Sequence, residues 1–132
     1  MTPERRFYEW FKRTMPKEWL LQRIETTTAN GVPDLNLFIP LTGQLWLEFK
    51  SFRSGPIYIR KEQYAWIKKR QLLGCNVSVI ALVGNEIMFW SSPFDVIKTK
   101  GAKLSIDSSP NFKTNRKNSP EIRDYIIKLC QN

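Results

Sequence analysis

Three ionisable residues that alternation places on one face of two predicted strands suggest a site for chemistry: Asp34, Glu48 and Lys50. They belong to two stretches, 34–39 and 45–50, in which apolar and polar residues alternate, as they do in a β-strand. Two carboxylates held close together repel each other and raise each other's pKa unless a divalent cation lies between them. The pattern therefore predicts a Mg²⁺ site, which Mn²⁺ can also fill.

The chemistry expected of such a site is phosphodiester hydrolysis. Mg²⁺ prefers carboxylates, backbone carbonyls, water and phosphate oxygens, and the carbonyl of Phe49 lies between Glu48 and Lys50 in the sequence. A cation held there lowers the pKa of a bound water and stabilises the charge that develops on the phosphate. Lys50, which shares a strand face with Glu48, can orient this water or neutralise the developing charge.

Composition favours a polyanionic partner. The 132 residues include 21 Lys and Arg against 12 Asp and Glu, which gives a net charge of +9 and favours nucleic acid. Histidine is absent, which excludes imidazole general-base catalysis, a His-coordinated zinc site and a Ser-His-Asp triad. The longest apolar stretch is too short to span a bilayer, and the N-terminus lacks a secretory pattern. We expect a cytoplasmic protein that does not enter a membrane.

The two strands need a core behind them. Their second face is wholly apolar and must pack on a helix; it consists of Leu35, Leu37, Ile39, Leu45, Leu47 and Phe49. We expect helices over 2–15, 60–73 and 120–131, further strands over 19–27, 75–83 and 86–90, and a short helix that begins at 92–95. The segment 98–118 is basic, has little apolar periodicity and is interpreted as a mobile arm. The expected division is a core over 1–97, this arm, and an amphipathic C-terminal helix within 119–132.

The order of these residues resembles the signature of the PD-(D/E)XK nuclease superfamily, and the surrounding sequence is similar to its VRR-NUC branch. The resemblance rests on Gly31-Val32-Pro33-Asp34, thirteen intervening residues, and Glu48-Phe49-Lys50, with Gln63 on the following helix. It covers about residues 1–90. It implies an α/β (α+β) restriction-endonuclease-like core, in which helices flank a mixed central sheet. It also implies a metal-dependent DNA endonuclease, Holliday-junction-resolvase-like and of phage type, which acts in the host cytoplasm as a homodimer on branched DNA.

The resemblance further implies an acid from the first helix at the metal. Glu4 lies at the edge of the apolar face of that helix, whereas Glu9 points nearly the opposite way, so helix geometry selects Glu4. Glu4 can equally be a first-turn residue that interacts with the helix dipole, and Glu25 is a rival acid. Gln63 leans toward the sheet, either as a site residue or as a hydrogen-bonded core amide.

Nucleic-acid contacts are expected outside this cluster. Basic residues on a loop and on the arm are the candidate phosphate contacts: Arg53, Lys113, Arg116 and Lys117. Trp46 shares the site face and can stack on an unpaired base or pack under the loop after Lys50. The competing hypothesis is a non-catalytic basic nucleic-acid-binding protein in which the acids pair with Lys50. RNA cleavage is a third, and the sequence leaves open the substrate structure and the number of metals.

Overall fold

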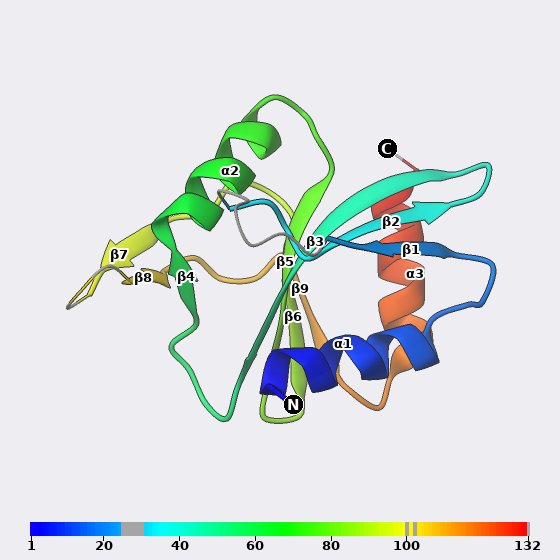
Figure 1. Ribbon diagram of the computed structural model, residues 1–132, viewed down its shortest axis with the longest axis horizontal. Coiled ribbons are helices and arrows are strands. Elements are labelled where there is room, and N and C mark those ends of the chain that lie inside the picture. Colours follow the sequence, from blue (N-terminus) through cyan, green and yellow to red (C-terminus); the bar gives the residue numbers. More distant parts are fainter. Residues whose placement is uncertain (25–30, 100, 102, 132) are drawn as a thin grey trace.

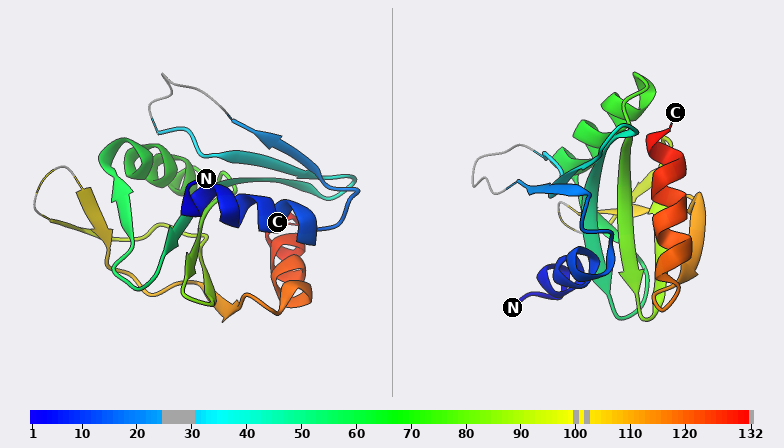
Figure 2. Two further views of the ribbon diagram at one scale, coloured as in Figure 1. Left: turned by 60° about the horizontal axis from the view of Figure 1, so that its bottom comes forward. Right: turned by 90° about the vertical axis from the view of Figure 1, so that its right-hand side faces the viewer.

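The computed structural model describes residues 1–24, 31–99, 101 and 103–131. The elements in chain order are α1 (Pro3–Thr14), β1 (Leu20–Arg23), β2 (Leu35–Ile39), β3 (Gly43–Phe52), β4 (Tyr58–Arg60), α2 (Lys61–Leu72), β5 (Val77–Val83), β6 (Glu86–Trp90), β7 (Val96–Lys98), β8 (Lys103–Ile106), β9 (Phe112–Asn115) and α3 (Ser119–Cys130). A six-stranded sheet has the order β1-β2-β3-β5-β6-β9, and a small sheet, β4-β8-β7, projects beside α2 (Figures 1 and 2). Only β3 and β5 run parallel within the large sheet. The sheet is therefore mixed, as predicted.

The apolar face of the β2–β3 hairpin is buried, which confirms the face assigned from alternation. Helices α1 and α3 pack against this face. Phe49 is central to the contact, since its ring meets those of Phe7, Tyr8 and Phe11 edge-on at centroid distances of 5.3, 5.7 and 5.3 Å. Edge-to-face contacts of this kind stabilise an aromatic cluster beyond the burial of apolar area alone. They fix the strand segment that carries Glu48 and Lys50.

The opposite face of the sheet packs against α2. Ile67 of this helix is fully buried on Val77, Val79 and Ala81 of β5. The first turn of α2 also lies against the loop that leads into β2, because a Cβ at Gly31 would come within 2.1 Å of the Glu62 carbonyl oxygen. Gly31 has a φ of +84°, a conformation that glycine adopts without strain. The glycine thus allows this loop to bring Asp34 close to α2.

Two predictions about the chain after β6 were wrong. Residues 92–95 open no helix and lead into β7, and the described part of 98–118 is not an irregular arm, since it contains β8 and β9. β8 pairs with both β4 and β7, and β9 pairs with β6. Each of these strands has only four residues, too few for alternation to stand out. Whether the chain divides functionally at 97 and 118 stays a prediction.

The C-terminal helix α3 docks on the body of the same chain, through buried Ile122, Ile126 and Cys130. Phe112 of β9 stacks on Tyr125 of this helix with ring centroids 4.2 Å apart. Among the described helices, none is long and apolar enough to cross a membrane.

Candidate functional site

The site lies where β2 and β3 separate. β2 follows β3 antiparallel only as far as the Leu35–Leu47 pair, whereas β5 accompanies β3 on its other side to Phe52. From Glu48 onward, no described strand pairs with β3 on the β2 side. Asp34 fills this opening, since its Oδ2 accepts a hydrogen bond of 2.9 Å from the backbone N–H of Phe49. The motif residues are thus brought together by the divergence of one hairpin.

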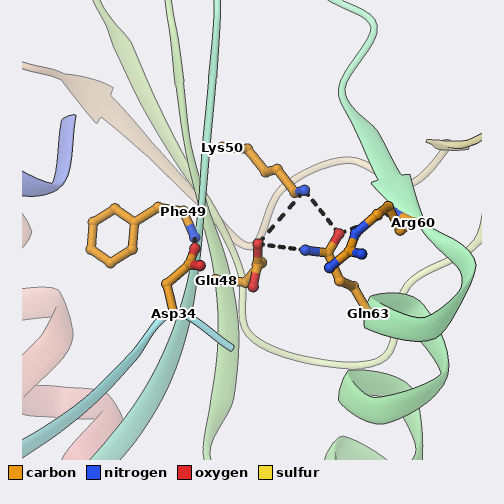
Figure 3. Close-up of polar contacts among 6 residues, drawn as sticks. All are labelled: Asp34, Glu48, Phe49, Lys50, Arg60 and Gln63. Carbon is orange, nitrogen blue, oxygen red and sulfur yellow. Dashed lines mark hydrogen bonds and ion pairs between the residues drawn. The ribbon is translucent and has the colours of Figure 1, made fainter. Parts of the chain in front are cut away.

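All five residues predicted to form the catalytic site line one pocket of about 390 Å³: Glu4, Asp34, Glu48, Lys50 and Gln63. They come from α1, from the residue before β2, from β3 and from α2. Figure 3 shows Glu48 and Lys50 of β3 facing Gln63 on α2, with Asp34 beside the Phe49 amide. Glu9 instead forms an ion pair of 3.1 Å with Arg5, and Glu25 lies outside the described residues.

Gln63 connects the charged residues of the pocket. Its Oε1 accepts hydrogen bonds from Lys50 Nζ at 2.9 Å and from the Arg60 backbone N–H at 3.0 Å. Its Nε2 donates to Glu48 Oε2 at 2.9 Å, and Lys50 Nζ lies 3.6 Å from the same oxygen. A single amide therefore sets the orientation of both the acid and the lysine (Figure 3).

Glu48 is the most strongly perturbed acid of the site. Only 1% of the residue is exposed, and burial, followed by the nearby Asp34, raises its pKa well above the usual value, although Lys50 acts in the opposite direction. Its second oxygen, Oε1, is buried and has no hydrogen-bond partner among the described residues. A buried carboxylate oxygen without a partner is costly, and a bound cation would satisfy it.

The ligands present fit Mg²⁺. The N–H and C=O of one strand residue point to the same side, so the Phe49 carbonyl is directed to the open edge where Asp34 lies. The described residues contain no group of three His, Cys, Asp or Glu side chains arranged to hold a metal ion. Asp34, Glu48 and this carbonyl form a small set of oxygen ligands, and Mg²⁺ typically binds through one or two carboxylates and keeps several waters.

Glu4 lies at the rim of the pocket. The residue is exposed, yet its carboxyl loses part of its hydration, which raises its pKa; Asp34 raises this pKa further, and Lys50 and Arg60 lower it. The carboxyl thus interacts electrostatically with three residues that line the pocket. Its part in binding a metal stays a prediction.

The predicted nucleic-acid contacts lie outside this pocket. Arg53 and Arg116 line a neighbouring hollow. Lys113 forms an exposed ion pair of 3.0 Å with Glu86, and Lys117 is exposed. Trp46 is half-buried against Trp66 of α2, with ring centroids 5.5 Å apart, so it packs on a helix. The structure leaves the contacts of these residues with nucleic acid as predictions.

Two cations in the pocket were not predicted from the sequence, Arg60 and Lys103. Arg60 immediately precedes α2 and lies three residues before Gln63, the spacing at which N-cap and N3 residues interact. That spacing could have placed Arg60 next to Gln63, and therefore at the site, from the sequence. Lys103 reaches the pocket because β8 pairs with β4, where Arg60 and Lys103 are opposite each other. No local feature of the sequence predicts this pairing.

The mixed sheet with its flanking helices defines a restriction-endonuclease-like fold. No family model matches the chain, and no curated protein sequence matches it. Fourteen chains of solved structures match its fold. One of them is Hjc of Archaeoglobus fulgidus, a Holliday junction resolvase from an archaeal hyperthermophile, with a TM-score of 0.53 and 14% identity over 91% of this chain and 89% of that chain. This likeness confirms the predicted fold class.

Proposed function

We propose that the protein is a Mg²⁺-dependent endonuclease that hydrolyses DNA phosphodiester bonds and prefers branched or junction DNA. The observation that carries the proposal is the buried Glu48, whose Oε1 has no described partner and which lies beside Asp34, Lys50 and Gln63. A carboxylate with a raised pKa in a polar pocket is typical of functional sites. The fold, similar to that of a protein named as a Holliday junction resolvase, supports the choice of substrate.

Each residue has a distinct role in this proposal. Asp34, Glu48 and the Phe49 carbonyl hold the cation, with Glu4 as the accessory acid. The bound cation, Mg²⁺ or Mn²⁺, supplies Lewis acidity and makes water a nucleophile at neutral pH. Lys50, held by Gln63, donates hydrogen bonds to the attacking water or to the phosphoryl oxygen that gains charge.

The positive charge of the chain fits a DNA substrate. Arg60 and Lys103 are at the edge of the pocket, where their charges can meet the phosphates that flank the bond to be cleaved. These two residues are added to the predicted phosphate contacts, which are Arg53, Lys113, Arg116 and Lys117. Trp46 is proposed as a contact to a base.

We further propose that the protein is related to the VRR-NUC branch, comes from a phage, acts in the host cytoplasm and forms a homodimer. The homodimer has one structural support. Leu20 and Phe38 are cross-strand neighbours on β1 and β2 and are 60% and 41% exposed, an apolar pair that a second copy can cover. Sedimentation velocity of the wild type and of Leu20→Ser measures whether this pair joins two copies.

The test is a cleavage assay on supercoiled plasmid, a splayed duplex and a four-way junction, with Mg²⁺, Mn²⁺ or EDTA. The proposal predicts cleavage with either metal, none in EDTA, and a loss of cleavage in Asp34→Ala and in Lys50→Ala. The other candidate is a non-catalytic binding protein, favoured by the direct 3.6 Å pairing of Lys50 with Glu48. Binding without cleavage under every condition, unchanged by both substitutions, supports that candidate and overturns ours.

A further inference from the structure

A second groove begins beside the catalytic pocket. One hollow, of about 350 Å³, is lined by residues of α1, the end of β3 and the chain after β9. It shares Arg6, Trp10 and Arg116 with a second hollow of about 540 Å³ that reaches Arg13, and it shares Phe52 with the catalytic pocket. Together the two hollows form the arginine groove, defined by Arg6, Trp10, Arg13, Arg53 and Arg116.

The fold ties the wall of this groove together at one end of the large sheet. The N–H of Gly84, in the β5–β6 turn, donates to the Phe52 carbonyl at 3.0 Å, and the N–H of Arg116 donates to the Asn85 carbonyl at 2.7 Å. The ends of β3, β6 and β9 are thereby joined, and the N-terminal half of α1 lies beside them (Figures 1 and 2). Segments far apart in the sequence thus place their arginines along one path.

Within the described part of the chain, the four arginines keep their positive charges. Among the described residues, none of them forms an ion pair with an acid; Arg6 Nη1 donates to the carbonyl of Met1 at 3.1 Å. The acid that lines the groove, Glu9, is paired with Arg5 instead. Four guanidinium groups along one groove repel each other, and a polyanion removes this repulsion. Guanidinium groups also match phosphate oxygens in geometry.

Trp10 distinguishes the groove from a simple basic patch. Its half-buried ring stacks on Phe7, with ring centroids 6.0 Å apart, and lines both hollows. A rigid aromatic side chain between cations is the arrangement that binds unpaired nucleotides, because every base has a face that can stack. Fully paired DNA offers such a side chain no free base.

We propose that the arginine groove binds an unpaired DNA strand, with its phosphates on the four arginines and a base on Trp10. The proposal rests on the proposed function, because the groove adjoins the pocket at Phe52 and takes the unpaired strand of a splayed or flapped substrate beyond the cleaved bond. It locates a preference for such substrates, over the fully paired arms of a four-way junction, in α1, the loop after β3 and Arg116.

The phosphate contacts are tested by binding in EDTA, where cleavage plays no part. Fluorescence anisotropy measures the Kd of a splayed duplex between 50 and 200 mM salt. Arg53→Ala/Arg116→Ala is expected to weaken binding at least about 10-fold and to reduce the slope of log Kd against log salt by about 2. The matched control is Lys69→Ala/Arg123→Ala, which removes the same charge from α2 and α3 and is expected to change Kd less than about 2-fold. Equal weakening by both pairs overturns the proposal.

The base contact is tested with two substitutions of Trp10. Trp10→Leu keeps apolar contact with Phe7 but removes the stacking surface, and it is expected to weaken binding to the splayed duplex by about 10-fold while the fully paired duplex is little affected. Trp10→Phe is expected to retain most of the affinity. Thermal melts establish that every variant is folded. Equal loss on both substrates, or no loss on either, overturns the assignment of Trp10.

The cleavage assay separates the two proposals. Groove variants that bind like the wild type, in a protein that cleaves junctions, refute the groove and leave the nuclease intact. A protein that never cleaves, but whose groove variants lose affinity for the splayed duplex, refutes the nuclease and supports the groove.

Discussion

Replacing Gln63 by Leu tests how the site is held together. The substitution keeps a buried side chain of similar size but removes three hydrogen bonds: one from Lys50 Nζ, one from the Arg60 N–H and one to Glu48 Oε2. It thereby leaves a buried lysine and a buried acid without the amide that lies between them.

The expected loss of stability follows from these contacts. Two of the bonds join charged groups, worth about 1.5–3 kcal/mol each, and the third is worth about 1 kcal/mol. The losses are not additive, since Lys50 and Glu48 already lie 3.6 Å apart and can pair directly. We expect the free energy of unfolding in EDTA to fall by about 3 kcal/mol, and by less in Mg²⁺, which compensates Glu48. Because Lys50 loses its orientation, single-turnover cleavage should slow about 100-fold.

The matched control is Gln71→Leu on the same helix. Gln71 is also buried, and its Nε2 donates to the carbonyls of Val77 and Trp90 at 2.8 and 3.3 Å, away from the pocket. Its Oε1 has no hydrogen-bond partner among the described residues, so the substitution should cost about 1–2 kcal/mol without slowing cleavage.

The assay pairs urea denaturation in EDTA and in Mg²⁺ with single-turnover cleavage of a four-way junction, at a temperature where each variant is folded. If Gln63→Leu cleaves as fast as the wild type, or if both variants slow cleavage equally, Gln63 does not position Lys50 and Glu48.

Four further outcomes are expected. The raised pKa of Glu48 means that Mn²⁺ affinity, measured by calorimetry, falls as pH falls through that pKa, because the cation needs the carboxylate; constant affinity from pH 8 to 5 contradicts this. In EDTA the effect of pH on stability has the opposite direction, because folded Glu48 binds a proton more tightly than unfolded Glu48 does. The melting temperature of the wild type, relative to that of Glu48→Gln, should therefore rise as pH falls toward 4.5. Burial raises the pKa of the Cys130 thiol to about 11, so in the folded protein at pH 8 only about one in a thousand Cys130 thiols is ionised. Ellman's reagent at pH 8 should therefore label the exposed Cys75 rapidly and the buried Cys130 only after unfolding. Phe49→Leu should lower the free energy of unfolding by about 2–4 kcal/mol in urea denaturation, since three edge-to-face contacts are lost; a change below about 1 kcal/mol would show that the α1 aromatics repack.

The site could be predicted from the sequence largely because it is built on one hairpin. Alternation places Asp34, Glu48 and Lys50 on the face opposite the buried Leu47 and Phe49, and the structure has this arrangement. Helical periodicity is a similarly local pattern, which is why α1, α2 and α3 were predicted within a few residues of their observed ends.

Apart from Arg60, the missed parts of the site and of the sheets depend on non-local pairing. Lys103 enters the pocket because β8, a strand of four residues, pairs with β4 more than forty positions earlier in the chain. β8 has the sequence Lys-Leu-Ser-Ile and β9 the sequence Phe-Lys-Thr-Asn, so neither strand has the apolar run that a sequence pattern needs. The basic composition of 98–118 led instead to the prediction of an arm.

The most direct test of the account is single-turnover cleavage of an end-labelled four-way junction, with each protein saturating the junction as established beforehand by binding in EDTA. The account predicts cleavage by the wild type on addition of Mg²⁺, and a loss of at least about 100-fold in Asp34→Asn, a nearly isosteric change that keeps an oxygen to accept the bond from the Phe49 amide. Cleavage by Asp34→Asn at the wild-type rate, or a wild type that binds the junction and leaves it intact in Mg²⁺ and Mn²⁺, would contradict the central claim.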